Sequence, residues 1–145
     1  MNKIYLAQTD TTVGFLCEDY KKLNSIKNRD IEQKVLREVN SFDTLKSFTR
    51  IPNKFKSKVR RSKKTTFIYP NQQSFRVVDD ATVHYDFIQK FKVIYSTSAN
   101  LTNKKFDLQL AQDKSDIIIY TKNDFYETTA SNLYKINNQT IKKLR

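Results

Sequence analysis

The chain has 145 residues, 38% of them hydrophobic and 12% aromatic, which suffices for the core of one domain over residues 1–145 but is short for two. No apolar run approaches the ~20 residues of a membrane span. The first residues lack the long apolar centre of a signal peptide, and the single Cys17 excludes an internal disulfide. We therefore expect a cytoplasmic protein that has no contact with a membrane.

The net charge of +12 is concentrated in one segment. Residues 1–43 hold equal numbers of basic and acidic side chains, whereas residues 44–78 hold no Asp or Glu at all. The positive electrostatic field of such a segment attracts polyanions such as nucleotides or RNA. Any single lysine, by contrast, is more simply explained as a solvated surface side chain. The basic residues of this segment are Lys46, Arg50, Lys54, Lys56, Lys58, Arg60, Arg61, Lys63, Lys64 and Arg76.

The chain begins with two stretches of strand character and a short helix. Residues 3–8 alternate weakly between apolar and polar, and residues 9–15 are rich in β formers. Glu18-Asp19-Tyr20 opens a helix that should stop near Asn28. Acidic residues in its first turn, with Lys27 and Arg29 in its last, would suit the helix dipole.

The next part of the chain is less regular. Residues 31–39 fit either a helix or a strand. Ser41 is placed to cap a helix that the Pro52 region ends. From there to Lys64 the basic sequence predicts a second helix or a mobile loop.

Strands and helices alternate through the remainder. Residues 65–69 and 74–78 predict two strands, residues 82–91 a helix, and residues 93–95 a short apolar strand.

Residues 116–120 predict another buried strand. Residues 132–136 and 140–144 predict a hairpin that turns at Asn137-Asn138. This order indicates an α/β fold with an open mixed sheet.

The stretch Ser96-Thr97-Ser98-Ala99-Asn100-Leu101 follows a predicted strand and carries small hydrogen-bonding groups. Ligands of open α/β sheets bind at the carboxyl edges of strands, so this stretch is a candidate binding loop. Taken alone, it is better explained as a turn in which Ser, Thr and Asn bond to their own backbone.

Several kinds of site are excluded by composition. Gly14 is the only glycine, which rules out a Walker A loop and a Gly-rich Rossmann turn. One His and one Cys cannot form a His/Cys zinc site, so we expect no structural metal bound by the protein. His84 lies on a predicted helix, where a structural role is expected. An enzyme of this composition would rely on positioning and cationic charge.

Five separated pieces, in the same order and at similar spacing, resemble the YrdC-type threonylcarbamoyl-AMP synthase family. The family's early P-T-D-T-V-Y-G-L motif is resembled by Thr9-Asp10-Thr11 with Gly14, and its K-G-R motif by Lys27-Asn28-Arg29. The V-R-V-P strand is resembled by Ser74-Phe75-Arg76-Val77, and the T-S-A-N-L-S loop by residues 96–101. The P-S-T-I motif is resembled by Ala130-Ser131-Asn132-Leu133, and Arg145 stands at the place of a terminal arginine. The resemblance covers nearly the whole chain and implies a YrdC-like fold with a basic concave face.

The resemblance also implies a reaction. Members of the family condense L-threonine, bicarbonate and ATP, the nucleotide as its Mg²⁺ complex, into threonylcarbamoyl-AMP and pyrophosphate. The product serves the t6A modification of tRNA, through a downstream threonylcarbamoyl transferase or by direct contact with tRNA. By resemblance, Lys27 and Arg29 are the catalytic cations. ATP would be bound by Lys27, Arg29, Ser98, Asn100 and Arg145, and threonine by Thr11, Arg76, Ser96 and Ser131.

Two alternatives remain open, because the family's P-L segment with its histidine, which follows K-G-R, is not recognisable around residues 34–39. One is a catalytically impaired YrdC-like paralogue that acts as a nucleotide- or RNA-binding module, with Phe48, Phe55, Phe67 and Tyr69 as possible stacking partners for bases. The other is a regulatory ATP sensor. The candidate RNA-binding residues are Lys54, Lys56, Lys58, Arg60, Arg61, Lys63 and Lys64.

Overall fold

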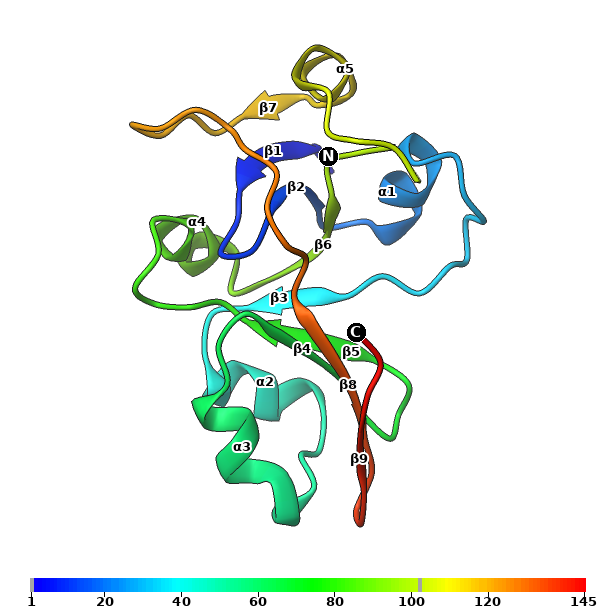
Figure 1. The fold of residues 1–145 in the computed structure, drawn as a ribbon, viewed down its shortest axis with the longest axis vertical. Helices are drawn as coiled ribbons and strands as arrows, with labels where there is room; N and C mark the ends of the chain where they lie inside the picture. Colours follow the sequence, from blue (N-terminus) through cyan, green and yellow to red (C-terminus); the bar gives the residue numbers. More distant parts are fainter. Residues whose placement is uncertain (1, 102) are drawn as a thin grey trace.

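One mixed sheet organises the computed structural model, which describes residues 2–101 and 103–145. Its nine strands within this described part are β1 Tyr5–Gln8, β2 Val13–Cys17, β3 Arg37–Val39, β4 Thr65–Ile68, β5 Ser74–Val77, β6 Val93–Ser98, β7 Ile117–Ile118, β8 Asn132–Ile136 and β9 Ile141–Lys143. They lie in the order β7-β1-β2-β6-β3-β5-β4-β8-β9 (Figure 1). Three neighbouring pairs, β1–β7, β3–β5 and β4–β8, are parallel, and the others are antiparallel. The predicted α/β class and mixed sheet are confirmed.

Short helices flank the sheet. The α-helices are α1 Tyr20–Ile26, α2 Phe42–Phe48, α3 Lys56–Arg61, α4 His84–Phe91 and α5 Leu108–Lys114, and a 3-10 turn spans Asn53–Phe55. Helix α1 packs on β2 and β6, α4 packs on β6, and α2 packs on β3 and β5. None of the helices in the described part of the chain is both long and apolar enough to cross a membrane.

The alternation of side chains along β2 shows why α1 and α4 cover opposite faces. Phe15 and Cys17 belong to one buried cluster together with Leu23 of α1. Leu16, which lies between them on the strand, belongs to another cluster together with Ile88 of α4. Successive side chains of a strand point to opposite faces, so β2 is buried on both sides. Cys17 is fully buried.

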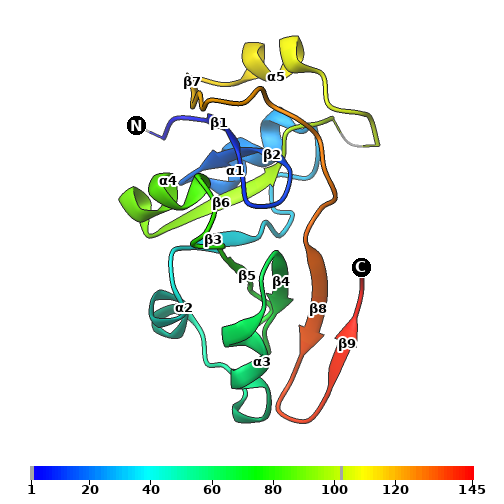
Figure 2. The same ribbon diagram turned by 60° about the vertical axis from the view of Figure 1, so that its left-hand side comes forward.

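Several predicted elements are confirmed. Ser41 caps α2 by accepting a hydrogen bond from Thr44 N at 3.1 Å. The basic segment forms α3, and residues 74–77 form a predicted strand, which pairs antiparallel with β4. Asn137 turns the β8–β9 hairpin, because its side chain accepts a hydrogen bond from Thr140 N at 2.7 Å. Figure 2 shows this hairpin running alongside β4.

Other predictions were wrong or incomplete. Residues 116–120 do not form a buried strand. Strand β7 has only two residues and pairs with β1 at the edge of the sheet, and Ile117 is 37% exposed. Within residues 31–39 only β3 is regular. Thr9 to Thr12 form the turn that joins β1 to β2 instead of continuing a strand. Helix α5 was not predicted.

Candidate functional site

The chain leaves α1 through a tight turn that projects two cations. Asn28 has a left-handed backbone (φ 54°), which Asn tolerates better than most residues. Asn28 N donates to Ser25 O at 3.1 Å and Arg29 N donates to Asn24 O at 3.2 Å, the pair of bonds that defines a Schellman motif. Helix α1 therefore ends at Ile26, before the two basic residues.

This turn corrects the prediction about the helix dipole. Lys27 is the C-cap residue of α1 and Arg29 lies outside the helix, so neither occupies its last turn. At the other end, Asp19 is the N-cap and accepts a hydrogen bond from Lys21 N at 2.9 Å. The basic pair is instead directed toward the end of β6.

Lys27 is buried against the loop that follows β6. Its side-chain Nζ donates to Ser98 O at 2.8 Å and also to Asn100 O, and the residue is 4% exposed. Burial, assisted by the positive charge of Arg29, lowers the pKa of Lys27 to about 8. The amine is therefore held in a fixed position by two backbone carbonyls that lie 71 and 73 residues further along the chain.

Arg29 is also held in place, at the rim of a cavity. Its Nε donates to Asn24 Oδ1 at 2.7 Å, and its Nη2 donates to Thr97 Oγ1 of β6 at 3.3 Å. The amide of Asn24 in turn donates to Ile31 O and Gln33 O, which ties down the irregular segment after the turn. Both partners of the Arg29 guanidinium are uncharged, so Arg29 has a defined direction while its positive charge is not offset by either of them.

The main cavity has a volume of about 290 Å³ and is walled by segments from the whole length of the chain. Its wall is formed by the β1–β2 turn, the segment between α1 and β3, strands β5 and β6, and the residues just before β8. The predicted site residues on its wall are Thr11, Arg29, Arg76, Ser96, Ser98, Ser131 and Arg145, and the remaining wall is formed by Thr9, Thr12, Gly14, Lys34, Val35, Leu36, Thr97 and Ala130. Lys27 contacts this wall through Ser98.

A second cavity of about 410 Å³ adjoins the first and shares Thr12, Ser98 and Ala130 with it. Asn100 and Phe106 line this second cavity, as do residues 127–129. No motif marks residues 127–129 in the sequence. Its position depends on a long-range contact, in which Thr128 N donates to Thr12 Oγ1 at 3.0 Å.

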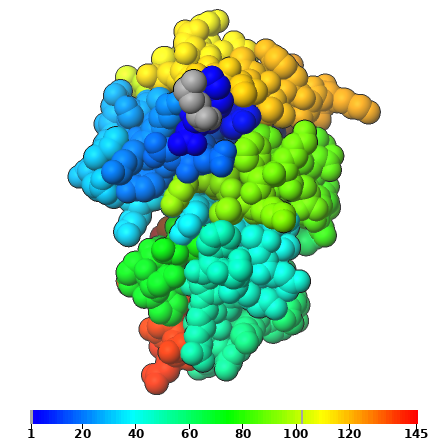
Figure 3. All heavy atoms as spheres, turned by 180° about the vertical axis from the view of Figure 1, so that it is seen from behind, coloured from blue at the N-terminus to red at the C-terminus, as the bar shows by residue number. Residues whose placement is uncertain are grey.

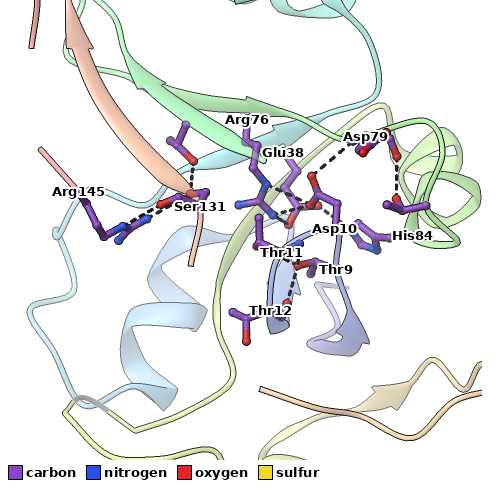
Figure 4. A network of polar contacts seen from close by, with 12 residues as sticks. Thr9, Asp10, Thr11, Thr12, Glu38, Arg76, Asp79, His84, Ser131 and Arg145 are labelled. Carbon is purple, nitrogen blue, oxygen red and sulfur yellow. Dashed lines mark hydrogen bonds and ion pairs between the residues drawn. The ribbon is translucent and has the colours of Figure 1, made fainter. Parts of the chain in front are cut away.

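Arg76 lies in the cavity wall at the centre of a buried ionic network (Figure 4). Its Nε donates to Asp10 Oδ1 at 3.1 Å, and its Nη2 lies 3.0 Å from Asp10 Oδ1 and 2.9 Å from Glu38 Oε2. The side chains of Asp10 and Glu38 are 0% exposed. His84 Nε2 lies 2.5 Å from Glu38 Oε1, so α4 also contributes to the network.

This network changes the expected role of Arg76. Burial alone would raise the pKa of Glu38, but His84 and Arg76 outweigh that effect and the pKa falls below its ordinary value. Asp10 and Glu38 together carry two negative charges against the single positive charge of Arg76, so the guanidinium exerts no net attraction on an anion. Among the described residues no partner of its Nη1 is found, so Arg76 offers the cavity a fixed N–H donor with little net charge.

Asp10 and Glu38 were missed as site residues in the sequence. Asp10 stands inside the T-D-T motif, which was the available signal, whereas nothing near Glu38 marks it. The expected structural role of His84 agrees with its burial and with its contact to Glu38.

The far wall of the cavity is held by Arg145. Its Nε donates to Ser131 O at 2.9 Å and its Nη2 to Ser131 Oγ at 3.1 Å. Ser131 Oγ lies 2.7 Å from Thr66 Oγ1 of β4, so its hydroxyl is also fixed. The two ends of the chain thereby contribute to one cavity, with Thr11 on one wall and Arg145 on another.

The basic residues of α3 and its flanks are not part of this wall. The residues predicted to bind RNA are all exposed, and those on α3 lie beneath α2 in Figure 1. Lys63, by contrast, lies 3.5 Å from Asp79, whose N–H donates to Asp10. Phe67 and Tyr69 are buried in the core, at 2% and 1% exposure, so they cannot stack on bases as the sequence had suggested.

Solved structures resemble this fold, although no family model and no curated protein matches the sequence. Sua5 of P. abyssi, solved with L-threonine, aligns over 99% of this chain with a TM-score of 0.80 and 18% identity. E. coli YciO aligns over 99% of this chain and 82% of its own, with a TM-score of 0.77 and 13% identity. HypF, solved in a phosphate- and nucleotide-bound form, aligns over 99% of this chain and 26% of its own, with a TM-score of 0.75 and 12% identity.

The chain spans about half the length of the Sua5 chain, of which 50% is covered. At these identities the likeness concerns the fold. The order of strands, the flanking helices and the extent of the alignments lead to one conclusion: this chain has the YrdC-like fold of Sua5 and YciO.

Proposed function

We propose that the chain is an L-threonylcarbamoyladenylate synthase, a nucleotidyltransferase that condenses L-threonine, bicarbonate and ATP into threonylcarbamoyl-AMP and pyrophosphate. The observation that carries this proposal is the convergence of the Lys27–Arg29 turn and the Ser96–Asn100 stretch on two adjoining cavities. One cavity is rich in arginine and hydroxyl groups, and the other is lined by an amide, threonines and one aromatic ring.

The chemistry requires cations around a triphosphate. The threonine amine and bicarbonate form a carbamate with loss of water; a carbamate oxygen then attacks the α-phosphorus, and the bond to pyrophosphate breaks. Negative charge builds up on the phosphate oxygens during this step, and fixed cations stabilise it. Lys27 and Arg29 suit this task because both are already held by hydrogen bonds before a ligand arrives. Arg145 would add a third cation from the opposite wall.

The nucleoside would occupy the second cavity, beside Ser98 and Asn100. Phe106 offers a ring on which a base can stack, and Asn100 Nδ2 is oriented by its bond to Lys104 O at 2.6 Å. The HypF structure, solved with phosphate and nucleotide on a related fold, supports a nucleotide as ligand.

Threonine would occupy the main cavity, among the hydroxyls of Thr11, Ser96 and Ser131. Because the two charges of Asp10 and Glu38 more than offset the charge of Arg76, we assign Arg76 a directed N–H toward the amino-acid carboxylate. The charge that attracts this carboxylate would come from Arg29 and Arg145 on the same cavity wall. The Sua5 structure with L-threonine supports an amino acid as ligand for this fold.

ATP would enter as its Mg²⁺ complex. Within residues 2–101 and 103–145 no three His, Cys, Asp or Glu side chains gather to hold a metal ion. We therefore assign the ligands of the Mg²⁺ ion to phosphate oxygens of the nucleotide, which is usual for Mg²⁺ that enters with a substrate. The product would pass to tRNA directly or through a downstream threonylcarbamoyl transferase.

Pyrophosphate release tests the proposal. Purified protein incubated with ATP, threonine and bicarbonate should release pyrophosphate only when all three are present. Lys27→Ala and Asn100→Ala should abolish most of this release, whereas Lys122→Ala, an exposed lysine outside both cavities, should not. Release that is indifferent to threonine would refute the proposal. ATP binding without turnover would favour the nucleotide-binding or sensor alternative.

A further inference from the structure

A row of side chains crosses one face of the sheet. Arg37 on β3 is directly opposite Tyr95 on β6 and Phe75 on β5, so the three side chains lie next to one another on the same face. Tyr95 packs against the cluster that contains Leu23 of α1, and Phe75 belongs to the cluster that contains Leu45 of α2. Arg37 therefore lies between the two parts of this face that α1 and α2 cover.

Arg37 lines a third cavity, which has a volume of about 160 Å³. Residues 32–35, which follow α1, form one side of it, and residues 72–74, at the β4–β5 turn, form the other. Figure 3 shows the surface notched between the blue-to-cyan residues after α1 and the green residues of this turn. The third cavity shares Lys34 and Val35 with the main cavity and no lining residue with the second, so it is a separate space.

The guanidinium of Arg37 is fixed by aromatic rings. Its Cζ lies 4.6 Å from the centre of the Phe75 ring, 5.3 Å from that of Tyr95 and 5.4 Å from that of Phe48. Within residues 2–101 and 103–145 we find no hydrogen bond or ion pair of this guanidinium, although Arg37 is half-buried. Polar groups that are shielded from water usually have an acceptor, so the free N–H donors beside a cavity point to a ligand that supplies one.

The charge of the cavity wall is positive. Lys34 adds a second cation, which is exposed and for which no acidic partner is found in the described part of the chain. Glu32 brings a negative charge to the wall, but its Oε1 lies 3.3 Å from Lys21 Nζ and its Oε2 accepts a hydrogen bond from Tyr20 at 3.1 Å. The carboxylate is thus offset by a lysine outside the wall, and the charges of Arg37 and Lys34 are left to attract an anion.

Both sides of the third cavity are held by hydrogen bonds before a ligand arrives. On one side Asn24 Nδ2 donates to Gln33 O at 2.9 Å, and on the other Tyr69 N donates to Gln73 O at 2.9 Å. Such preorganisation lowers the entropic cost of binding. The volume is well below the ~300–1,000 Å³ of sites for drug-sized ligands, so the occupant is a small molecule.

We propose that the third cavity is a binding site for a small oxyanion, a carboxylate or a phosphate, held by the guanidinium of Arg37 and the amine of Lys34. The planar fork of an arginine matches the oxygens of both groups. The rings of Tyr20 and Tyr95, whose centres are 5.5 Å apart, offer an apolar surface to the rest of the ligand. The site does not depend on the proposed synthase activity, because Arg37 lines neither of the cavities assigned to threonine and the nucleoside.

The test follows the backbone amide NMR signals of residues 72–74, which line the third cavity and neither of the other two. The full chain is titrated with inorganic phosphate and, separately, with succinate. Succinamide, which has a similar shape without the charge, is the neutral control. Arg37→Met removes the guanidinium from this cavity, whereas Arg29→Met removes a guanidinium from the main cavity and is the matched control.

We expect the signals of residues 72–74 to shift until they saturate with at least one of the two anions, and the tighter of the two identifies the class of ligand. Arg37→Met should weaken this binding roughly ten- to hundredfold, the loss expected for a charge-assisted hydrogen bond. Arg29→Met should leave it unchanged. Arg37→Lys, which keeps the charge without the fork, and Lys34→Met, at an exposed position, should each weaken it several-fold and so separate lost binding from misfolding.

Four results would overturn the proposal. They are no saturable shift of residues 72–74 with either anion, equal shifts with succinamide, unchanged affinity in the Arg37 variants, and a loss in Arg29→Met as large as that in Arg37→Met. The last result would place the anion in the main cavity.

Discussion

Lys27 Nζ donates a hydrogen bond to Ser98 O over 2.8 Å and so connects two residues that are 71 positions apart. The contact joins the turn after α1 to the end of β6, the two segments on which both cavities depend. Because the donor is a buried amine, the contact combines positioning with charge at one atom. The first two predictions concern this amine.

Replacing Lys27 by Met should weaken nucleotide binding more than it weakens folding. Loss of a charge-assisted hydrogen bond costs ~1.5–3 kcal/mol, which corresponds to roughly a ten- to hundredfold loss of ATP affinity. Lys21→Met is the matched control, because Lys21 is exposed on the same helix and pairs with Glu32. Isothermal titration with ATP measures both variants. Equal affinities in the two would remove Lys27 from the nucleotide site.

The low pKa of Lys27, about 8, predicts a pH dependence of stability. In the unfolded chain the amine has its ordinary pKa of 10.5, so between about pH 8 and 10.5 the unfolded state binds more protons than the folded state. The contribution of Lys27 therefore makes the free energy of unfolding rise with pH in this window, by at most ~1.4 kcal/mol per pH unit. Below about pH 8 the amine is charged in both states and the slope vanishes.

Urea unfolding of wild type and Lys27→Met, measured from pH 7 to 10, isolates this contribution, because other groups titrate equally in both proteins. The difference between the two curves should change across the window. Polyphosphate affinity should move in the opposite direction and decline as the wild-type amine loses its proton above about pH 8. A constant difference would contradict the burial of the amine.

Replacing Arg76 by Met should destabilise the protein strongly. The change leaves Asp10 and Glu38 buried without their cation, and breaking a buried ion pair in this way costs ~3–5 kcal/mol. Arg37→Met is the control, because Arg37 is half-buried on neighbouring β3 and lies over the rings of Phe75 and Tyr95. Its loss should cost only ~1–2 kcal/mol.

Thermal unfolding at neutral and acidic pH compares these two variants. The lowered pKa of Glu38 means that its ionised form contributes stability above the unfolded value of 4.5, and that this contribution is lost as the pH falls below it. The gap between Arg76→Met and wild type should therefore narrow toward acidic pH. A gap that stays constant with pH would indicate that lost packing, and not charge, causes the destabilisation.

Gly14→Ala should disturb the cavity wall. An added Cβ would lie 3.0 Å from Thr97 O and 3.1 Å from Thr9 Cγ2, which forces β2 away from β6 or from the turn. Overpacking of this kind costs ~1–3 kcal/mol. Chemical denaturation measures the loss, and ATP affinity should fall with it because Thr97 holds Arg29. An unchanged free energy of unfolding would show that the backbone at Thr97 can move to make room for the added Cβ at little cost.

Much of the fold follows from local patterns in the sequence. The Ser41 cap, the β4–β5 pair and the Asn137 hairpin were predictable because turn and cap chemistry is local. The edge strand β7 was misjudged, since its apolar run suggested burial that depends on neighbours remote in sequence.

The site shows the same division. The motif residues that reach the cavity wall were found because several short patterns occur in order, whereas Glu38 and the segment around Thr128 were not. Glu38 sits in an ordinary strand, and only tertiary structure brings Arg76 and His84 to its two carboxylate oxygens. The charge of Arg76 within the site therefore could not be judged from the motif that contains it.

A crystal structure with ATP and L-threonine bound tests the central claim most directly. The account predicts the phosphates on Lys27 and Arg29, the base beside Asn100 and Phe106, and the amino acid between Thr11 and Ser131. A nucleotide bound on another face, with both cavities unchanged, would contradict it.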